Sequence, residues 1–232
     1  MDLIRLSNRL AAIAAFVPQG ASVVDVGTDH GHIPIFLAQR GGAARIVASD
    51  LHEGPLQSAR SSAGEYGVGD KIEFIRADGL AFDGVNGIDA VIISGVGGEL
   101  IASIIDRAGW LKGQETLLIL QPQSKIESLC SYLTGNGYPI TDALLVRDSG
   151  KLYGVMTARA HRDSARGADG ILALLSVLYD KRDPLLPEFL DRMMSREMRA
   201  ARGRRLSKEH VESSDSDFPE KIRHMREEIK KW

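Results

Sequence analysis

An acidic turn that contains glycine follows the first predicted strand, and its residues limit the ligands it could hold. The β-branched run SVVDVG ends in Gly27, and Thr28-Asp29-His30-Gly31 follows. In a G-x-G-x-x-G nucleotide loop the second glycine lets the backbone approach a pyrophosphate, but Asp29 occupies that position here. A carboxylate at a helix start repels phosphates. The turn therefore disfavours a dinucleotide and suits a cofactor with a cationic sulfonium.

Further acids end or follow the next two predicted strands. Asp50 ends the run RIVASD, where a carboxylate can accept hydrogen bonds from both ribose hydroxyls. Asp78 follows the run KIEFIRA and is placed to accept a hydrogen bond from an adenine amino group. Each acid alone is more readily explained as a helix cap or turn residue. Together with Asp25 they favour a ligand site, because ligands of open α/β sheets bind at strand ends.

The fourth and fifth predicted strands lead into a glycine-rich loop and a pair of amides. Ser94-Gly95-Val96-Gly97-Gly98-Glu99 opens a predicted helix, so bare backbone and free N–H groups face the cleft. Gln121-Pro122-Gln123 ends the run TLLILQ, and its amides suit the edge of a base. The alternatives are a tight turn that needs positive φ and a polar strand-to-helix turn.

Alternating strands and helices position these residues. Strands are predicted at SVVDVG, RIVASD, KIEFIRA, IDAVIIS and TLLILQ, and helices over 2–17, 33–40, 55–66, 99–108 and 127–133. Unbroken Val/Ile/Leu runs are typical of a parallel sheet covered on both faces. YPITDALLVRD and KLYGVMTAR, joined across Ser149-Gly150, predict a terminal antiparallel hairpin. This α/β sheet is Rossmann-like, and its ending is that of an S-adenosylmethionine-dependent methyltransferase.

The last part of the chain loses its strand signals and predicts a small helical domain. We therefore expect a cofactor-binding domain over 1–160 and a helical domain over 161–232, with two long helices folded back on each other around the polar connector EHVESSDSDFPE. Residues 1–160 hold 13 Lys+Arg and 17 Asp+Glu, a balance of -4, whereas residues 161–232 hold 16 and 14, a balance of +2.

A stripe of arginines lies on one face of the predicted tail helix. Its spacing of four, three and three residues, with two further arginines, is a surface suited to RNA phosphates. A solvated helix face is the alternative. The candidate RNA-binding residues are Arg192, Arg196, Arg199, Arg202, Arg204 and Arg205.

Composition and the remaining motifs exclude several classes. The chain has 232 residues, 44% hydrophobic and 26% charged, as in ordinary globular proteins. Cys130 is the single cysteine, no apolar run is long enough to span a bilayer, and no signal peptide starts the chain, so a cytoplasmic protein without a membrane partner is expected. No metal is expected, because nothing fixes a third ligand beside His30 and His32.

Several segments resemble a known family. SNRLAAIAAFVPQGASVVDVGTDHGHIP, ISGVGGELI, LILQPQ and DSGKLYGV look like the bacterial tRNA (adenine-22 N1)-methyltransferase family (TrmK), over about residues 5–157. The tail resembles that family's coiled-coil-like C-terminal domain in kind. The resemblance implies S-adenosylmethionine as cofactor and tRNA as partner, and a monomer is favoured.

The resemblance also assigns site residues. It implies that the mouth of the catalytic site is formed by Gly95, Gly97, Gln121 and Pro122, and Asp29 is a further catalytic candidate on chemical grounds. It implies cofactor contacts from Asp25, Gly27, Thr28, Asp29, His30, Asp50, Leu51, Asp78, Gly79 and Ser94.

The chemistry of such a reaction needs no obligatory base. Adenine N1 carries a lone pair at neutral pH, so positioning supplies much of the catalysis. Positive charge develops on the adenine, and the carboxylate of Asp29 is the candidate to stabilise it. Alternatively, Asp29 binds the amino-acid part of the cofactor. A methyltransferase of another RNA, of a protein or of a small molecule, and a non-catalytic nucleic-acid-binding protein on this fold, remain as rival functions.

Overall fold

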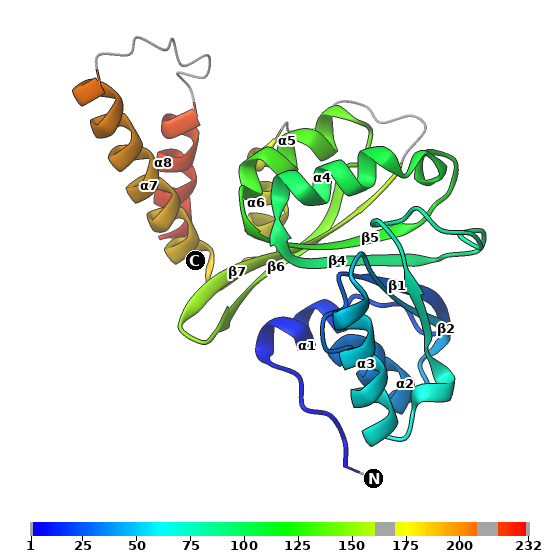
Figure 1. Ribbon diagram of the computed structural model, residues 1–232. Helices are drawn as coiled ribbons and strands as arrows, with labels where there is room; N and C mark the ends of the chain where they lie inside the picture. Colours follow the sequence, from blue (N-terminus) through cyan, green and yellow to red (C-terminus); the bar gives the residue numbers. More distant parts are fainter. Residues whose placement is uncertain (1, 161–169, 208–217, 231–232) are drawn as a thin grey trace. The chain divides into compact units, whose positions relative to one another are not determined.

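The computed structural model describes residues 2–160, 170–207 and 218–230 of the chain. By their contacts these residues form two compact units, 1–177 and 178–232. The first unit is built on a seven-stranded sheet with helices on both faces (Figure 1). The predicted Rossmann-like α/β class is therefore confirmed for this unit.

The sheet reverses its strand order at its centre. The spatial order is β3-β2-β1-β4-β5-β7-β6, and the neighbours from β3 through β5 are parallel. The chain thus builds outward from β1 to β3 and then returns to add β4 beside β1. The strands are β1 (Ala21–Val26), β2 (Ala43–Asp50), β3 (Glu73–Arg76), β4 (Ala90–Gly97), β5 (Leu117–Ser124), β6 (Ile140–Asp148) and β7 (Lys151–Arg159).

The predicted antiparallel ending of the sheet is confirmed. β7 pairs antiparallel with both β5 and β6. Ser149 and Gly150 between β6 and β7 have φ values of 48° and 75°, so both central residues of the turn are left-handed, as in the tight turns that suit a twisted hairpin.

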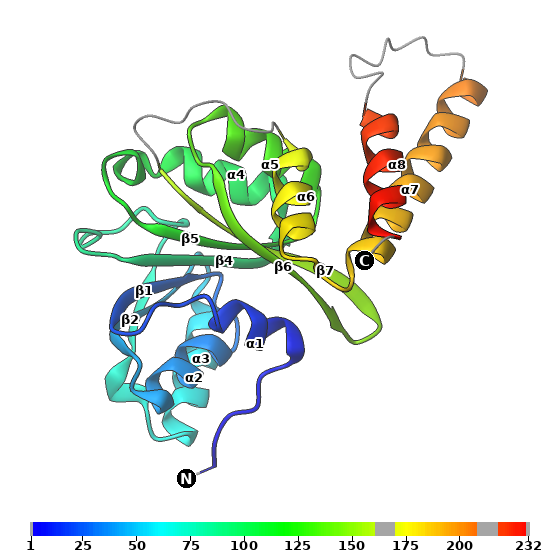
Figure 2. The ribbon, with the colours of Figure 1, turned by 180° about the vertical axis from the view of Figure 1, so that it is seen from behind.

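Helices cover both faces of the sheet, as the unbroken apolar strands require. In Figures 1 and 2, α1, α2 and α3 lie on one face, and α4 and α5 lie on the other. The strand interiors are fully buried, with Val24, Val47, Ile92 and Ile119 at 0% exposure. The helices are α1 (Asn8–Ala14), α2 (His32–Arg40), α3 (Glu53–Glu65), α4 (Gly98–Arg107) and α5 (Ile126–Gly135).

The first helix is shorter than the apolar spacing over 2–17 predicts. It begins at Asn8 because the Ser7 side chain caps it, accepting from the backbone N–H of Leu10. The preceding residues are extended and bound to α2: Gln39 accepts from the N–H of Ile4 at 2.9 Å and donates to the carbonyl of Asp2 at 3.0 Å. Tertiary contacts to α2 thus replace the expected first two helical turns.

The boundary between the two units lies later than the expected 160/161. The first unit extends to Val177, inside α6 (Ile171–Asp180), because the start of α6 is packed like core. Leu174 and Leu175 are fully buried, and the N–H of Gly170 donates to Thr134 Oγ1 of α5 at 2.9 Å.

The second unit contains a pair of packed helices. α7 (Leu186–Ser207) contacts α8 (Phe218–Ile229), with an ion pair of 2.7 Å between Arg226 Nε and Asp191 Oδ1. A helical tail was predicted and is present, but the expected pair of long helices and the coiled-coil character are not shown, since α8 has only 12 residues. The predicted polar connector spans 209–220, and its residues 209–217 lie outside the described residues. Nowhere in the described ranges is a helix both long and apolar enough to cross a membrane.

The glycine at the start of α4 generates a stability prediction. A Cβ at Gly98 would overlap the backbone carbonyl of Lys125, an atom that cannot simply rotate away. Gly98→Ala is therefore expected to lower the free energy of unfolding by about 1–3 kcal/mol, measured by urea denaturation. The control is Gly54→Ala in α3, where a Cβ meets nothing within 4 Å and alanine should stabilise the helix. Equal stabilities of Gly98→Ala and the wild type would contradict this account.

Candidate functional site

The loop after β1 is tied to β2 at the carboxyl end of the sheet. The N–H groups of Gly27 and Thr28 both donate to the carbonyl of Ser49, at 2.8 Å and 3.2 Å. Gly27 has a φ of 74°, which favours glycine. The first predicted loop therefore lies directly beside the end of β2, which carries Asp50.

Asp29 is held in a conformation that few residues other than glycine adopt. Its φ is 47°, a left-handed value that aspartate tolerates better than most residues. Its side chain is 75% exposed, and its neighbour His30 is fixed by a contact of 2.7 Å between Nδ1 and Ser58 Oγ. Gly31 then packs on α3, where a Cβ would lie 3.1 Å from the Cβ of Ala59. The loop thus presents the Asp29 carboxylate to solvent from a fixed backbone.

Asp25 is a buried acid beneath this loop. Burial raises its pKa to about 7, and the negative charge of Asp50 adds to the rise. The hydroxyl of Thr28 opposes the rise, yet its Oγ1 has no partner of good hydrogen-bond geometry, and neither has Ser49 Oγ. A fraction of Asp25 is therefore neutral near pH 7, and a nearby cation would favour its ionised form.

Asp50 lies at the end of β2 with one oxygen in use. Its Oδ1 accepts from the backbone N–H of His52 at 2.9 Å, which is a turn contact of the kind considered as an alternative from the sequence. The other carboxylate oxygen has no described partner. Leu51, beside it, is 49% exposed, which is unusual for a large apolar side chain. An acid and an apolar surface thus adjoin at this strand end.

Asp78 is engaged by an arginine that the sequence did not indicate. Nη1 and Nη2 of Arg107, at the end of α4, donate to its two carboxylate oxygens, and this pairing raises the pKa of Arg107. Both partners are about half exposed, so water screens the pair. Gly79 next to it packs on α4, where a Cβ would lie 2.9 Å from Ile104 Cγ2.

The glycine-rich loop and the Gln121-Pro122 pair are brought together. β4 extends through Gly97, and Ser94 is the register partner of Gln121 in β5. Gly95 has the positive φ considered from the sequence, 79°, but it lies within β4, at a register shift between Ser94 and Val96, and not in a tight turn. The side chain of Gln121 is fully buried and internally bonded, with Nε2 donating to the carbonyl of Pro122 at 2.8 Å. It therefore shapes the strand end instead of presenting its amide freely.

Arg9 and Tyr153 converge on the same place and were missed from the sequence. Arg9 Nη1 donates to Gln121 Oε1 at 2.8 Å, and its guanidinium carbon lies 5.7 Å from the ring centroid of Tyr153. No local spacing reveals a contact between residues 112 positions apart. One signal was available, because Arg9 is three residues after Leu6 and four before Ile13, on the apolar face of the first helix.

The arginine stripe is described only in part. Arg192, Arg196 and Arg199 lie on α7, as predicted, but Arg192 forms an ion pair of 2.7 Å with Glu188 and is not a free cation. The side chains of Arg202, Arg204 and Arg205 lie outside the described residues.

His30 and His32 are neighbours, with ring centroids 5.7 Å apart. Burial lowers the pKa of His32, and the adjacent His30 lowers it further. In the described part of the chain, no group of three His, Cys, Asp or Glu side chains could hold a metal ion.

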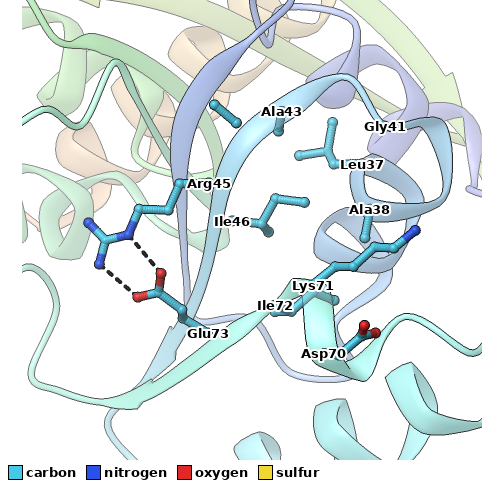
Figure 3. A pocket seen from close by; sticks show the side chains of 11 residues that line it. Leu37, Ala38, Gly41, Ala43, Arg45, Ile46, Asp70, Lys71, Ile72 and Glu73 are labelled. Atoms are coloured by element: carbon cyan, nitrogen blue, oxygen red, sulfur yellow. Dashed lines mark hydrogen bonds and ion pairs between the residues drawn. The ribbon is translucent and has the colours of Figure 1, made fainter.

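A cavity of about 490 Å³ lies at the opposite edge of the sheet (Figure 3). It is lined by the first residues of β2 and β3 and the end of α2. Two of its charged groups are paired, since Arg45 donates to both carboxylate oxygens of Glu73, at 2.9 Å and 2.7 Å. This cavity is separate from the carboxyl ends that carry the candidate residues.

The residues at the carboxyl edge fit S-adenosylmethionine better than a phosphate cofactor. Asp25, Asp29 and Asp50 gather carboxylates where a pyrophosphate would need positive potential. The buried hydroxyls of Thr28 and Ser49 remain without partners in the described structure. A cationic cofactor with a ribose diol matches these acceptors.

Comparison with known proteins shows the family of this chain. Residues 6–156 match the family described as "Methyltransferase domain". The chain is 34% identical over 173 residues to a tRNA (adenine(22)-N(1))-methyltransferase of Bacillus subtilis (strain 168), covering 74% of this chain and 71% of that protein.

Solved structures agree as well. A Streptococcus pneumoniae protein, described as a putative tRNA (m1A22) methyltransferase in complex with S-adenosyl-L-methionine, is 28% identical, with a TM-score of 0.76 over 98% of this chain and 99% of that one. The fold is also shared by M. capricolum TrmK, at 19% identity and a TM-score of 0.74, over 97% of this chain and 98% of that one.

The sheet order, the antiparallel hairpin and the acidic first loop define a class I S-adenosylmethionine-dependent methyltransferase. Within that class, the chain belongs to the tRNA (adenine(22)-N(1))-methyltransferase family.

The buried Asp25 generates a prediction about pH. Its folded pKa of about 7 lies above the ordinary value of 3.8, so its neutral form stabilises the fold at low pH, and this stabilisation is lost as pH rises through about 7. Asn does not ionise, so the Asp25→Asn variant does not lose stability in this way. Without cofactor, it should therefore gain on the order of 2–3 kcal/mol relative to the wild type between pH 5 and pH 8. Thermal unfolding at the two pH values checks this, and parallel pH profiles would contradict it.

Proposed function

We propose that this protein transfers a methyl group from S-adenosylmethionine to N1 of adenosine 22 in tRNA. The observation that carries the proposal is the 34% identity to the Bacillus subtilis enzyme of that name over 74% of the chain. The geometry at the carboxyl ends of β1, β2 and β4 supports it, because it supplies acceptors for a cationic cofactor and, near the end of β4, a glycine of positive φ, Gly95. Since tRNA is the proposed substrate, we expect the protein to act in the cytoplasm.

The loops of β1, β2 and β3 are assigned to the cofactor. When bound, the cofactor supplies an electrophilic methyl group. The second oxygen of Asp50 is free to accept from a ribose hydroxyl, and the exposed Leu51 offers an apolar surface to the adenine ring. Asp78 keeps its proposed role toward the adenine amino group, but it must share its carboxylate with Arg107. All these groups come from one chain, so a monomer suffices for the cofactor site.

The loops of β4 and β5 are assigned to the target base. Adenine N1 attacks with its own lone pair, so these residues need only to orient the base and exclude water. Gly95 and Gly97 leave bare backbone at the mouth, and the buried Gln121 fixes its edge through the carbonyl of Pro122. A carboxylate stabilises the positive charge that develops on adenine. The exposed side chain of Asp29 is the proposed source of this carboxylate.

The decisive experiment is incubation of the protein with unmodified tRNA and methyl-labelled S-adenosylmethionine. Nucleoside mass spectrometry is expected to find the label in 1-methyladenosine, and a tRNA in which guanosine replaces adenosine 22 should take up none. Label in another nucleoside, or no label in any tRNA, would overturn the proposal.

Asp29→Asn is expected to slow methylation more than it weakens cofactor binding. Its charge matters most when the adenine becomes cationic, so we expect at least a ten-fold lower single-turnover rate at saturating cofactor. Calorimetry with S-adenosylmethionine is the paired measurement. A weaker affinity with an unchanged rate would instead make Asp29 a ligand of the cofactor's amino-acid part.

Neutralising the stripe on α7 is expected to weaken tRNA binding while leaving cofactor affinity intact. The variant changes Arg192, Arg196, Arg199 and Arg202 to Gln. The slope of log affinity against log salt should become shallower by up to about 0.9 for each phosphate that the variant no longer neutralises, if the bound RNA is helical and behaves like duplex DNA. Arg223→Gln on α8 serves as a single-charge control in the same unit. If the stripe variant binds tRNA like the wild type across a salt series, the stripe is a solvated face.

A further inference from the structure

Arg9 is the point where three separate elements meet at the mouth of the site. It comes from α1, donates to the buried Gln121 of β5 at 2.8 Å, and stacks over Tyr153 of β7. Its Nη1 also lies close to the register shift near the end of β4, since a Cβ at Gly95 would be 3.9 Å from it. Two anchors thus hold the guanidinium at the carboxyl ends of β4 and β5.

The orientation of this guanidinium is fixed. Gln121 Nε2 is committed to the carbonyl of Pro122, so Gln121 must turn its Oε1 toward Arg9. The planar ring of Tyr153 limits the guanidinium from another side. Arg9 uses only one of its five N–H donors in the bond to Gln121. Its Nε and Nη2 have no hydrogen-bond partner among the described residues.

The charge of Arg9 is also unbalanced. Arg9 is half-buried, yet in the described parts of the chain it forms no ion pair with any carboxylate. Arg107 at the same edge, by contrast, is paired with Asp78. A partly buried cation without a counter-charge is costly, and an anionic ligand would remove that cost.

The charge that develops in the proposed reaction argues against direct contact between the Arg9 guanidinium and the target adenine. Positive charge develops on the target adenine, so a guanidinium in contact with its N1 edge would raise the barrier. A neighbouring oxyanion is the chemically consistent partner.

We propose that Arg9 is an oxyanion-binding residue of the mouth, whose free N–H donors bind either the carboxylate of the cofactor or a phosphate of the substrate RNA. The second source rests on the proposed function. Gly95 suits both, because its lack of a side chain leaves room beside the guanidinium for a ligand. Fork-shaped donors favour a two-oxygen anion, so Lys should replace Arg only in part.

The test compares Arg9→Gln and Arg9→Lys with the wild type in two assays. If the anion is the cofactor carboxylate, Arg9→Gln should bind S-adenosylmethionine at least ten-fold more weakly by calorimetry, while its affinity for decarboxylated S-adenosylmethionine stays at the wild-type value. If the anion is an RNA phosphate, cofactor affinity should be unchanged, the KM for tRNA should rise at least five-fold, and its salt dependence should become shallower. In either arm Arg9→Lys should recover part of the loss.

The matched control is Arg40→Gln. Arg40 also stacks on an aromatic ring, at 4.5 Å from the centroid of Phe36, but it ends α2 at the opposite edge of the sheet. It should change neither assay. Should Arg9→Gln fail to fold, Arg9→Lys alone decides: it must fold with the wild-type melting temperature and still lose several-fold in one assay.

Two results would overturn the proposal. One is wild-type affinity for the cofactor together with a wild-type KM for tRNA in the Arg9 variants. The other is an equal loss toward cofactor and decarboxylated cofactor that follows a lowered melting temperature and is not recovered by Lys, because that outcome makes Arg9 a structural support for Gln121. If wild-type protein methylates no tRNA, the proposed function fails, and calorimetry still decides the cofactor arm.

Discussion

Parallel pairing of β1 with both β2 and β4 is the constraint on which the site depends. Because the three strands run the same way, their carboxyl ends meet at one edge, and the strand order reverses between β1 and β4, the position where ligands of open α/β sheets bind. The loop after β1 is then locked to β2 through the carbonyl of Ser49. Asp25 and Asp50, which are 25 residues apart in sequence, are brought near enough for the charge of Asp50 to raise the pKa of Asp25.

The burial of Asp25, with Asp50 nearby, is costly for the protein without a ligand. A buried carboxyl whose pKa is about 7 resists ionisation, and the hydroxyls of Thr28 and Ser49 beside it are unsatisfied in the described structure. Binding sites commonly hold such strained or unpaired groups, because the ligand completes them. The polar groups that weaken the fold at this edge are therefore the ones that favour a cationic ligand.

Local patterns in the sequence predict most of this architecture, and they fail where distant contacts decide. Apolar runs predict the strands, and Ser149-Gly150 predicts the hairpin turn, because φ preferences and burial are encoded within a few residues. The start of α1 was misplaced, since Gln39 and not helix propensity determines residues 2–7. Likewise, no spacing in the sequence predicts that Arg9 donates a hydrogen bond to Gln121 or that Arg107 donates one to Asp78. The acids were found because they follow strands, whereas their partners are known only from the fold.

The extended residues before α1 have a consequence for the mouth of the site. A helix of seven residues is too short to be stable alone, so α1 depends on its attachments. Ile4, 7% exposed, and the two bonds of Gln39 tether the chain to α2 and reduce the conformational entropy available to the residues that follow. The position of the Arg9 guanidinium is thus coupled, through this tether, to the same helix that begins at the acidic loop. The first residues of the chain and the loop after β1 are therefore both attached to the same helix, α2.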